Sequence, residues 1–188
     1  MTRDADVIVV GAGPAGAATS ILLAEHGLAV ITLDRARFPR DKICGEYLSP
    51  EAGRVLDRLG VLKTLDGAGA VPLAGMRITA PDGTRLEGVY ASTGAFRPYR
   101  GHALGVSRTV LDAILADRLR ALGIDVRERV RVTDVVRAEG AVAGVRATAE
   151  DGSTSTLRAP LVIAADGRAS VVAQRLGAGF GATPTSSR

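Results

Sequence analysis

Three glycines near the N-terminus have the spacing of a phosphate-binding turn. Gly11, Gly13 and Gly16 follow the apolar run VIVV, and the apolar residues that come next recur at helical spacing from Ala15 until Gly27. The stretch therefore predicts a strand, a tight turn and a helix. Backbone amides at the N-terminus of such a helix bind a pyrophosphate, and glycine lets the backbone approach it closely.

An acidic residue lies where such a unit needs a sugar ligand. The run LAVITLD is almost continuously apolar, which is typical of a parallel strand covered on both faces, and it ends at Asp34. A carboxylate roughly 20 residues beyond the glycines accepts hydrogen bonds from ribose hydroxyls. The pattern predicts a nucleotide-cofactor site. The alternative is a glycine-rich connector in an unrelated α/β protein, which would have no need for Asp34.

Composition limits the partners that we expect. The chain has 188 residues, 46% of them hydrophobic and 23% charged, which suits one globular domain or one domain with a small lobe. The net charge is +4, but the arginines of the segment RERVR alternate with glutamate and valine, as on the solvated side of a strand. There is no tryptophan and aromatic residues make up 3%, so base-stacking surfaces are scarce and nucleic acid is not an expected partner.

Cysteine and histidine usage indicates the compartment and excludes metal chemistry. Cys44 is the only cysteine and cannot form an internal disulfide, and the N-terminus lacks the features of a signal peptide. No apolar run is long enough for stable membrane insertion, so we expect a cytoplasmic, soluble protein. His26 and His102 lack the partner spacing of a metal site, and no metal is expected.

The remaining elements follow from caps, periodicity and turn residues. Ser107 should cap a helix that stops at Gly123, with Asp112, Asp117 and Arg118 on its polar face. A second helix should start at Pro50, with Ser49 as its cap and Gly60 as its stop, and a short third helix should be capped by Ser170. The expected β-structure is a hairpin over 71–89 with a turn at 80–83 and a three-stranded antiparallel meander over 124–160. A buried parallel strand over 161–167 should then return to the first sheet.

Four segments in this order resemble one family. The glycine unit ending in Asp34, FPRDKICGEYLSP, VSRTVLDAIL and IAADGRASVVAQRLG together resemble flavoprotein monooxygenases of the p-hydroxybenzoate hydroxylase type, and most closely the branch with geranylgeranyl reductases. The resemblance covers nearly the whole chain, and CGE and ADGRAS are its most specific pieces. It implies an α/β fold with a Rossmann-like FAD-binding parallel sheet and an antiparallel β-meander. An FAD-binding domain would span 1–176 with a β-rich insertion at about 71–106, followed by a disordered tail over 177–188, and the second, substrate-binding half would be missing.

The resemblance also implies roles for individual residues. Cys44 and Glu46 would be catalytic, although a cysteine is also a common small core residue. Arg108 would reach the FAD diphosphate or would be an ordinary solvated helix arginine, and Arg40 is open to the same two readings. The segment at Asp166 would touch the flavin or would be only a turn. The cofactor-binding residues that it implies are Gly11, Gly13, Pro14, Ala15, Gly16, Asp34, Arg35, Cys44, Gly45, Arg108, Val130, Asp166 and Gly167.

The function implied is an FAD-dependent oxidoreductase. NAD(P)H would reduce the flavin, which would then activate oxygen to hydroxylate or epoxidise a small or lipophilic organic substrate. One alternative is a geranylgeranyl-reductase-like enzyme that reduces isoprenoid double bonds without oxygen. A second alternative is a truncated, non-catalytic FAD-binding module. An ordinary NAD-linked dehydrogenase would explain the glycine loop but not ADGRAS.

Overall fold

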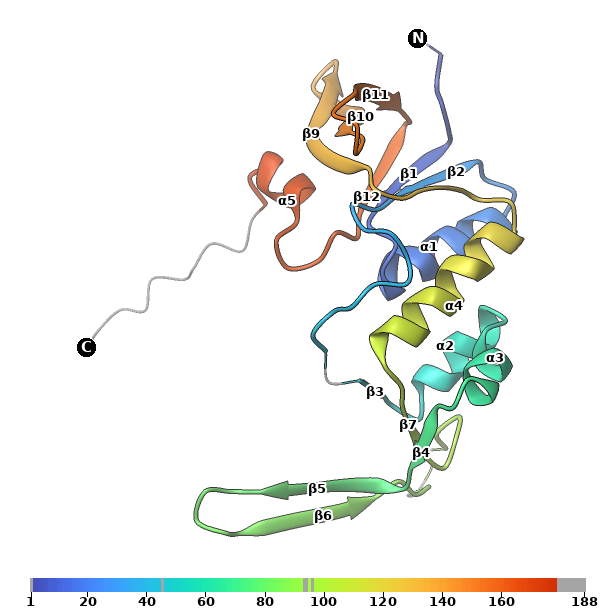
Figure 1. Ribbon diagram of the computed structural model, residues 1–188, viewed down its shortest axis with the longest axis vertical. Helices are drawn as coiled ribbons and strands as arrows, with labels where there is room; N and C mark the ends of the chain where they lie inside the picture. The colour runs from blue at the N-terminus through green and yellow to red at the C-terminus, as the bar shows by residue number, and fades with distance from the viewer. Residues whose placement is uncertain (1, 45, 93–94, 96, 179–188) are drawn as a thin grey trace, which may run out of the picture. The chain divides into compact units, whose positions relative to one another are not determined.

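The computed structural model describes residues 2–44, 46–92, 95 and 97–178 (Figure 1). The chain divides into two compact units. The first unit consists of Met1–Arg37 and Leu119–Arg188, and the second consists of Phe38–Arg118. The insertion expected at about 71–106 lies within the second unit.

A four-stranded parallel sheet forms the centre of the first unit. Its strand order is β12-β1-β2-β8, with β1 at Val7–Val10, β2 at Val30–Leu33, β8 at Asp125–Arg127 and β12 at Leu161–Ala164. All residues of β1 and β2 are buried, which explains their unbroken apolar sequences. Helix α1 (Pro14–Glu25) connects these two strands, so the predicted strand, turn and helix are confirmed. The α/β fold class is confirmed as well.

Two details of this sheet differ from the sequence prediction. The segment 124–136 was expected entirely in the meander, but β8 pairs in parallel with β2, and a turn at Arg129, whose φ is +57°, follows it. Strand β12 is not fully buried, since Leu161 is 49% exposed. Within the described part of the chain β12 is an edge strand of this sheet, and both of its end residues are exposed, so its apolar sequence does not reflect complete burial.

The predicted antiparallel meander is the second sheet of the first unit. Strands β9 (Arg131–Ala138), β10 (Ala141–Thr148) and β11 (Thr154–Arg158) pair in the order β11-β10-β9. Residues of both sheets share a core, in which Val145 and Ile8 are fully buried. Helix α5 (Val171–Arg175) begins as predicted, because Ser170 Oγ accepts a hydrogen bond from the Ala173 amide at 3.0 Å. Residues 177 and 178 close its end through backbone hydrogen bonds, and the rest of the expected tail lies outside the described residues.

The second unit contains short helices and two small antiparallel sheets. Its helices are α2 (Ala52–Arg58), α3 (Leu62–Gly67) and most of α4 (Arg108–Ala121). One sheet joins β3 (Tyr47–Leu48), β7 (Ala103–Gly105) and β4 (Val71–Leu73) in the order β3-β7-β4, and the other is the hairpin of β5 (Gly75–Thr79) and β6 (Arg85–Val89).

Two expectations for the second unit need correction. Helix α2 begins at Ala52 rather than Pro50, because residues 50 and 51 form a turn in which Ser49 Oγ accepts from the Ala52 amide at 3.3 Å. The hairpin is confirmed over 75–89, but Val71–Leu73 pairs with β7 instead. The caps of α4 are as predicted, since Ser107 Oγ accepts from the Val110 amide and Gly123 has a φ of +71°.

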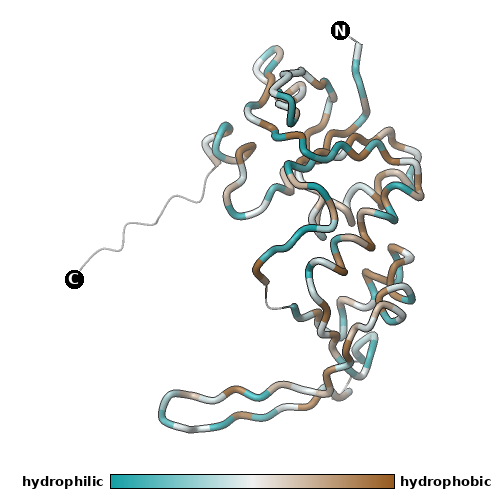
Figure 2. Tube along the Cα trace, in the orientation of Figure 1, coloured by the Kyte–Doolittle hydropathy of each residue, from teal (hydrophilic) through white to brown (hydrophobic). Residues whose placement is uncertain are grey.

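The strands of the two units differ in the hydropathy of their residues. Strands β1, β2 and β12 are coloured as hydrophobic almost throughout, whereas hydrophobic and hydrophilic residues alternate along the β5–β6 hairpin (Figure 2). In that hairpin the apolar side chains remain exposed, with Ile78 at 55% and Leu86 at 68%. Among the described residues, no helix combines the length and the apolar character that crossing a bilayer requires.

The glycine turn provides a test of the packing between strand and helix. A Cβ atom on Gly16 would lie 1.7 Å from the Gly11 carbonyl oxygen, so Gly16→Ala must displace backbone. We expect it to lower the free energy of unfolding, measured by urea denaturation, by about 1–3 kcal/mol or more. Gly67→Ala is the control, because a Cβ atom on Gly67 would meet nothing within 4 Å, and should change stability by less than about 1 kcal/mol. Equal effects of the two substitutions would contradict the close approach at Gly16.

Candidate cofactor site

The turn between β1 and α1 is shaped by close backbone approaches. Gly11 has a φ of +100°, and a Cβ there would lie 2.4 Å from the Ala165 carbonyl oxygen. Gly13 is the N-cap of α1 and Pro14 follows at the first helical position, but no side chain caps the helix and its first turn contains no acidic residue. The first amides of α1 therefore retain their capacity to bind an anion, which the helix dipole also favours.

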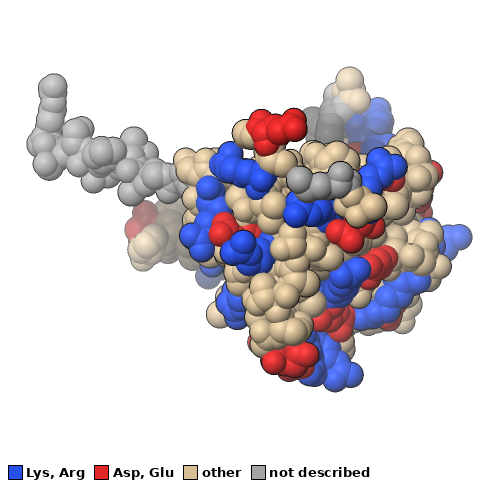
Figure 3. Space-filling view, turned by 90° about the horizontal axis from the view of Figure 1, so that it is seen from above, with Lys and Arg blue, Asp and Glu red and all other residues tan. Residues whose placement is uncertain are grey.

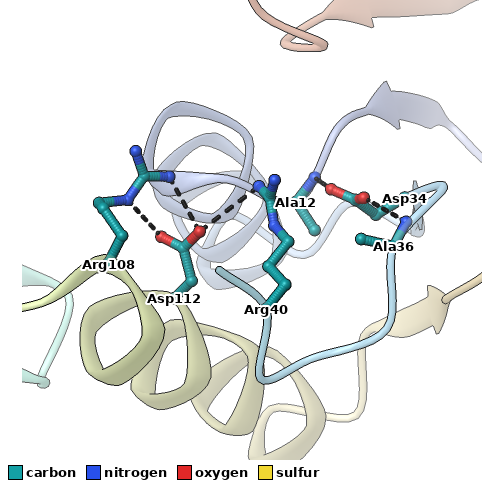
Figure 4. Close-up of polar contacts among 6 residues, drawn as sticks. All are labelled: Ala12, Asp34, Ala36, Arg40, Arg108 and Asp112. Atoms are coloured by element: carbon teal, nitrogen blue, oxygen red, sulfur yellow. Dashed lines mark hydrogen bonds and ion pairs between the residues drawn. The ribbon is translucent and has the colours of Figure 1, made fainter. Parts of the chain in front are cut away.

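Asp34 is turned toward this glycine turn. Its Oδ2 accepts a hydrogen bond from the Ala12 amide and its Oδ1 from the Ala36 amide, both at 2.8 Å (Figure 4). Only 7% of the residue is exposed. The Val130 amide donates to the Asp34 carbonyl at 2.9 Å, so predicted cofactor residues from two segments lie together here. Because each carboxylate oxygen can accept more than one hydrogen bond, this geometry is compatible with hydroxyl donors.

Asp166 follows β12 and leaves one buried acceptor without a partner. Its Oδ2 accepts from the Val171 amide at 2.7 Å, whereas its buried Oδ1 has no hydrogen-bond partner. An unsatisfied buried acceptor costs about 1–3 kcal/mol, which a ligand hydroxyl or amide would recover. Gly167 adopts a φ of +85°, as expected after a strand that ends in a turn. Asp166 thus fits a group that carries hydrogen-bond donors.

The second unit contains further residues that the sequence predicted for the site. Cys44 is exposed, and its side chain hydrogen-bonds the Arg108 guanidinium. The pKa of Arg108 is raised, chiefly by its hydrogen bonds to Asp112 and to a smaller extent by Cys44. Glu46 is exposed with a φ of +51°, and its carbonyl accepts from the Val106 amide. The catalytic roles of Cys44 and Glu46 stay predictions, and Gly45 lies outside the described residues.

Sequence reasoning missed the partner of Arg108. Asp112 was expected on the polar face of its helix, but its exposure is 0%. It binds Arg108 through two hydrogen bonds and also pairs with Arg40 (Figure 4). The spacing of four residues between Arg108 and Asp112 was the available signal, since such pairs meet on a helix surface. Arg35 is exposed, and its predicted cofactor contact stays a prediction.

Charges of both signs are distributed over the molecule. On the face shown in Figure 3, basic and acidic side chains are interspersed rather than gathered into one basic patch. Several arginines pair with acidic residues, such as Arg127 with Asp125 at 2.7 Å. In the part of the chain that the structure describes, no group of three or more His, Cys, Asp or Glu side chains could hold a metal ion.

The first unit thus has the parts of a dinucleotide site, and comparison with known proteins identifies its family. A family model described as FAD binding domain matches residues 4–187. The chain belongs to this FAD-binding domain family. The resemblance inferred from the sequence is therefore confirmed, and the donor and acceptor set described above fits FAD.

Several relatives have curated names. The chain is 36% identical to menaquinone reductase of Mycolicibacterium smegmatis, 33% identical to a flavin-dependent monooxygenase of Mycobacteroides abscessus and 30% identical to digeranylgeranylglycerophospholipid reductase of Methanosarcina mazei. These matches cover 94%, 93% and 92% of this chain but 41%, 37% and 40% of the relatives. The chain therefore spans about two fifths of the length of the curated relatives that it matches.

A solved structure confirms the fold. The myxobacterial chondrochloren halogenase CndH, described as a variant of FAD-dependent halogenases, superposes with a TM-score of 0.83 at 29% identity. The superposition covers 93% of this chain and 40% of that one. The architecture of an FAD-dependent enzyme is thus shared over nearly the whole chain.

Asp34 offers a stability test that needs no ligand. Asp34→Ala removes the acceptor of two backbone amides, one of them in a buried bond to Ala12, and should lower the free energy of unfolding by about 1–3 kcal/mol in urea denaturation. Asp6→Ala is the control, since Asp6 accepts one exposed bond from the Ala29 amide that water can replace. A loss at Asp34 no larger than the loss at Asp6 would contradict the role of the buried carboxylate.

Proposed function

We propose that the first unit binds FAD at the carboxyl edge of its parallel sheet. The observation that carries this proposal is that Asp34, the glycine turn and Asp166 come from three neighbouring strand ends and present an uncapped helix N-terminus together with carboxylate acceptors. Ligands of open α/β sheets bind at this edge. Membership in the FAD-binding domain family supports the same assignment.

Each part of this site would hold a different portion of FAD. The turn from Gly11 through Gly16, including Gly13, Pro14 and Ala15, would receive the diphosphate, and Asp34 the adenosine ribose. Arg35 and Val130 would lie beside that nucleoside. Asp166 and Gly167 would contact the ribityl chain, for which the unsatisfied Oδ1 is suited. The proposed cofactor contacts in the second unit are Cys44, Gly45 and Arg108. Arg108 is proposed for the diphosphate, because a guanidinium can bind phosphate oxygens through two hydrogen bonds.

The reaction that we propose is an NAD(P)H-dependent monooxygenation of a small or lipophilic organic substrate. FAD, when bound, supplies the redox chemistry, and the protein contributes binding, orientation and exclusion of water. Identity to a protein named flavin-dependent monooxygenase supports this class. Cys44 and Glu46 are the proposed catalytic side chains. We further propose that the protein is cytoplasmic, with no nucleic-acid partner.

A second candidate is reduction of isoprenoid double bonds. It is supported by 30% identity to a protein named digeranylgeranylglycerophospholipid reductase. The two candidates differ in their use of oxygen, so turnover of a lipid alkene under anaerobic conditions would favour the reductase and exclude the monooxygenase. A non-catalytic FAD-binding module is the third possibility, and substrate-dependent oxidation of NAD(P)H by this chain would exclude it.

FAD retention tests the proposed site directly. The purified chain mixed with FAD should keep the visible flavin bands through gel filtration. Asp166→Asn should weaken FAD binding about tenfold, because the uncharged amide is a poorer acceptor for ligand hydroxyls. The same substitution should change the unfolding free energy of the ligand-free protein by less than about 1 kcal/mol, since the asparagine oxygen can keep the bond from the Val171 amide and a neutral amide group replaces the unpaired oxygen of a charged carboxylate.

The matched control for this experiment is Asp151→Asn. Asp151 lies in an exposed turn of the same unit, where its Oδ1 accepts from the Ser153 amide, a bond that asparagine also makes. FAD affinity measured by fluorescence titration should not change in this variant. No flavin bound to the unsubstituted chain would refute the proposed function. Equal affinities of the two variants would refute the contact at Asp166.

A further inference from the structure

The β5–β6 hairpin, which the structure describes in full, has one face without charged side chains. Successive residues of a strand point to opposite faces of the sheet. The register of the hairpin therefore places four uncharged residues on the same face, which are Met76, Ile78, Leu86 and Gly88. The charged residues of the two strands lie on the opposite face, and they are Arg77, Arg85 and Glu87. The colours alternate along both strands accordingly (Figure 2). We refer to the first set of four residues as the apolar hairpin face.

The apolar hairpin face is accessible and has room for a ligand. Met76 is 49% exposed, and Ile78 and Leu86 are more exposed than Met76. The space opposite Met76 is open, because a Cβ atom on Gly88 would meet nothing within 4 Å. A hollow of about 370 Å³ is lined by the Met76–Gly88 pair and the two pairs beside it, a volume that is sufficient for a small organic molecule. Since a two-stranded hairpin is only marginally stable in water, a ligand that covers this face would stabilise it.

Two tyrosines lie at one end of this face. The Tyr90 amide donates to the Ala74 carbonyl at 2.9 Å, which continues the hairpin by one further pair. Tyr90 is therefore on the same face as Leu86 and Gly88. Its hydroxyl lies 2.7 Å from the hydroxyl of Tyr47, a residue of β3 that is 38% exposed. An apolar surface thus ends at a hydrogen-bonded pair of phenols.

The tyrosine pair is suited to a neutral hydrogen-bond acceptor. When one hydroxyl donates to another, the second hydroxyl keeps its own proton for an acceptor outside the pair. Hydrogen bonds in series polarise one another, so this second hydroxyl is a stronger donor than an isolated phenol. The pKa of Tyr47 is raised to about 12, chiefly by the hydrogen bond to Tyr90, and the Tyr47 hydroxyl therefore stays protonated at neutral pH. A carbonyl oxygen is an acceptor of this kind.

We infer that the apolar hairpin face and the Tyr47–Tyr90 pair bind a neutral, lipophilic compound that carries a carbonyl group. The apolar body of the compound covers the side chains of the face, and its carbonyl oxygen accepts a hydrogen bond from the tyrosine pair. A charged ligand would find no counter-ion among the side chains of this face. The binding goes beyond the proposed function, because it concerns the second unit alone. Only the assignment of such a compound as the substrate would rest on the proposed function.

Two fluorophores test the apolar part of the site in the absence of FAD. Prodan is a neutral aromatic ketone, and dimethylaminonaphthalene has the same ring system without the carbonyl. Fluorescence titration of the chain should show saturable binding of both probes, with Prodan bound more tightly. Leu86→Ser should raise both dissociation constants about tenfold, because it removes apolar contact area. Arg85→Ser is the control, since the neighbouring residue lies on the opposite face, and it should leave both constants unchanged.

The hydroxyl contact is tested by removing one oxygen atom. Tyr90→Phe should raise the dissociation constant of Prodan about tenfold and leave that of dimethylaminonaphthalene unchanged. Tyr99→Phe is the matched control, because the Tyr99 hydroxyl donates to Asp57 at 2.7 Å instead, and neither probe should respond to it. Tyr47→Phe is the second variant if Tyr90→Phe does not fold. It should also weaken binding of Prodan alone, since the remaining hydroxyl loses its partner.

Several outcomes would overturn this inference. These are the absence of saturable Prodan binding to the unsubstituted chain, unchanged binding in Leu86→Ser, and equal losses for the two probes in Tyr90→Phe. A dimer in sedimentation analysis that dissociates in Leu86→Ser would assign the face to a second copy of the chain. Binding to phosphatidylcholine vesicles that is lost in Leu86→Ser would assign it to a membrane surface, and either assignment would overturn the inference. A chain that binds Prodan as expected but does not bind FAD would refute only the proposed function.

Discussion

The carboxylate of Asp34 connects the two strand ends on which the rest of the first unit depends. One oxygen accepts from the amide of Ala12 in the glycine turn, and the other accepts from Ala36 beyond β2. Because the side chain is almost entirely buried, these bonds are protected from competition by water. The turn is thereby held in shape in the ligand-free chain. A bound nucleotide would meet an ordered loop, and the cost of ordering that loop would not be subtracted from its affinity.

The glycine turn is equally constrained from the side of β12. Gly11 and Gly16 have no room for a Cβ, because the carbonyl of Ala165 and the turn's own backbone occupy that space. This contact places Asp166 next in the chain after Ala165, where one of its oxygens stays buried and unsatisfied. Functional sites commonly retain such unfavourable groups, whose cost is recovered when the ligand binds. The strand ends therefore combine tight backbone packing with unused hydrogen-bonding capacity.

Much of this architecture could be predicted from local sequence. The strand, turn and first helix followed from apolar periodicity and glycine spacing, and the caps at Ser107 and Ser170 followed from side chains that bond within one turn. The short strands at 47–48 and 103–105 could not be predicted, because two or three residues carry no periodicity and pair only through distant partners. Strand β8 was placed in the wrong sheet for the same reason. The burial of Asp112 was also missed, since periodicity alone does not reveal that Arg40 approaches from another segment.

The order of strands in the parallel sheet has a consequence for biosynthesis. Val7 lies beside Leu161, so β1 acquires its neighbour on that side only after more than a hundred further residues have been translated. Until then, the flank of β1 that later pairs with β12 exposes unpaired amides and carbonyls, which are prone to association with other chains. Closing so large a loop costs chain entropy, and contacts between distant residues therefore form more slowly than local helices. The side of the proposed nucleotide site that is formed by β12 and Asp166 is consequently among the last parts of the chain to assemble. Nascent chains that stall before β12 lack it altogether.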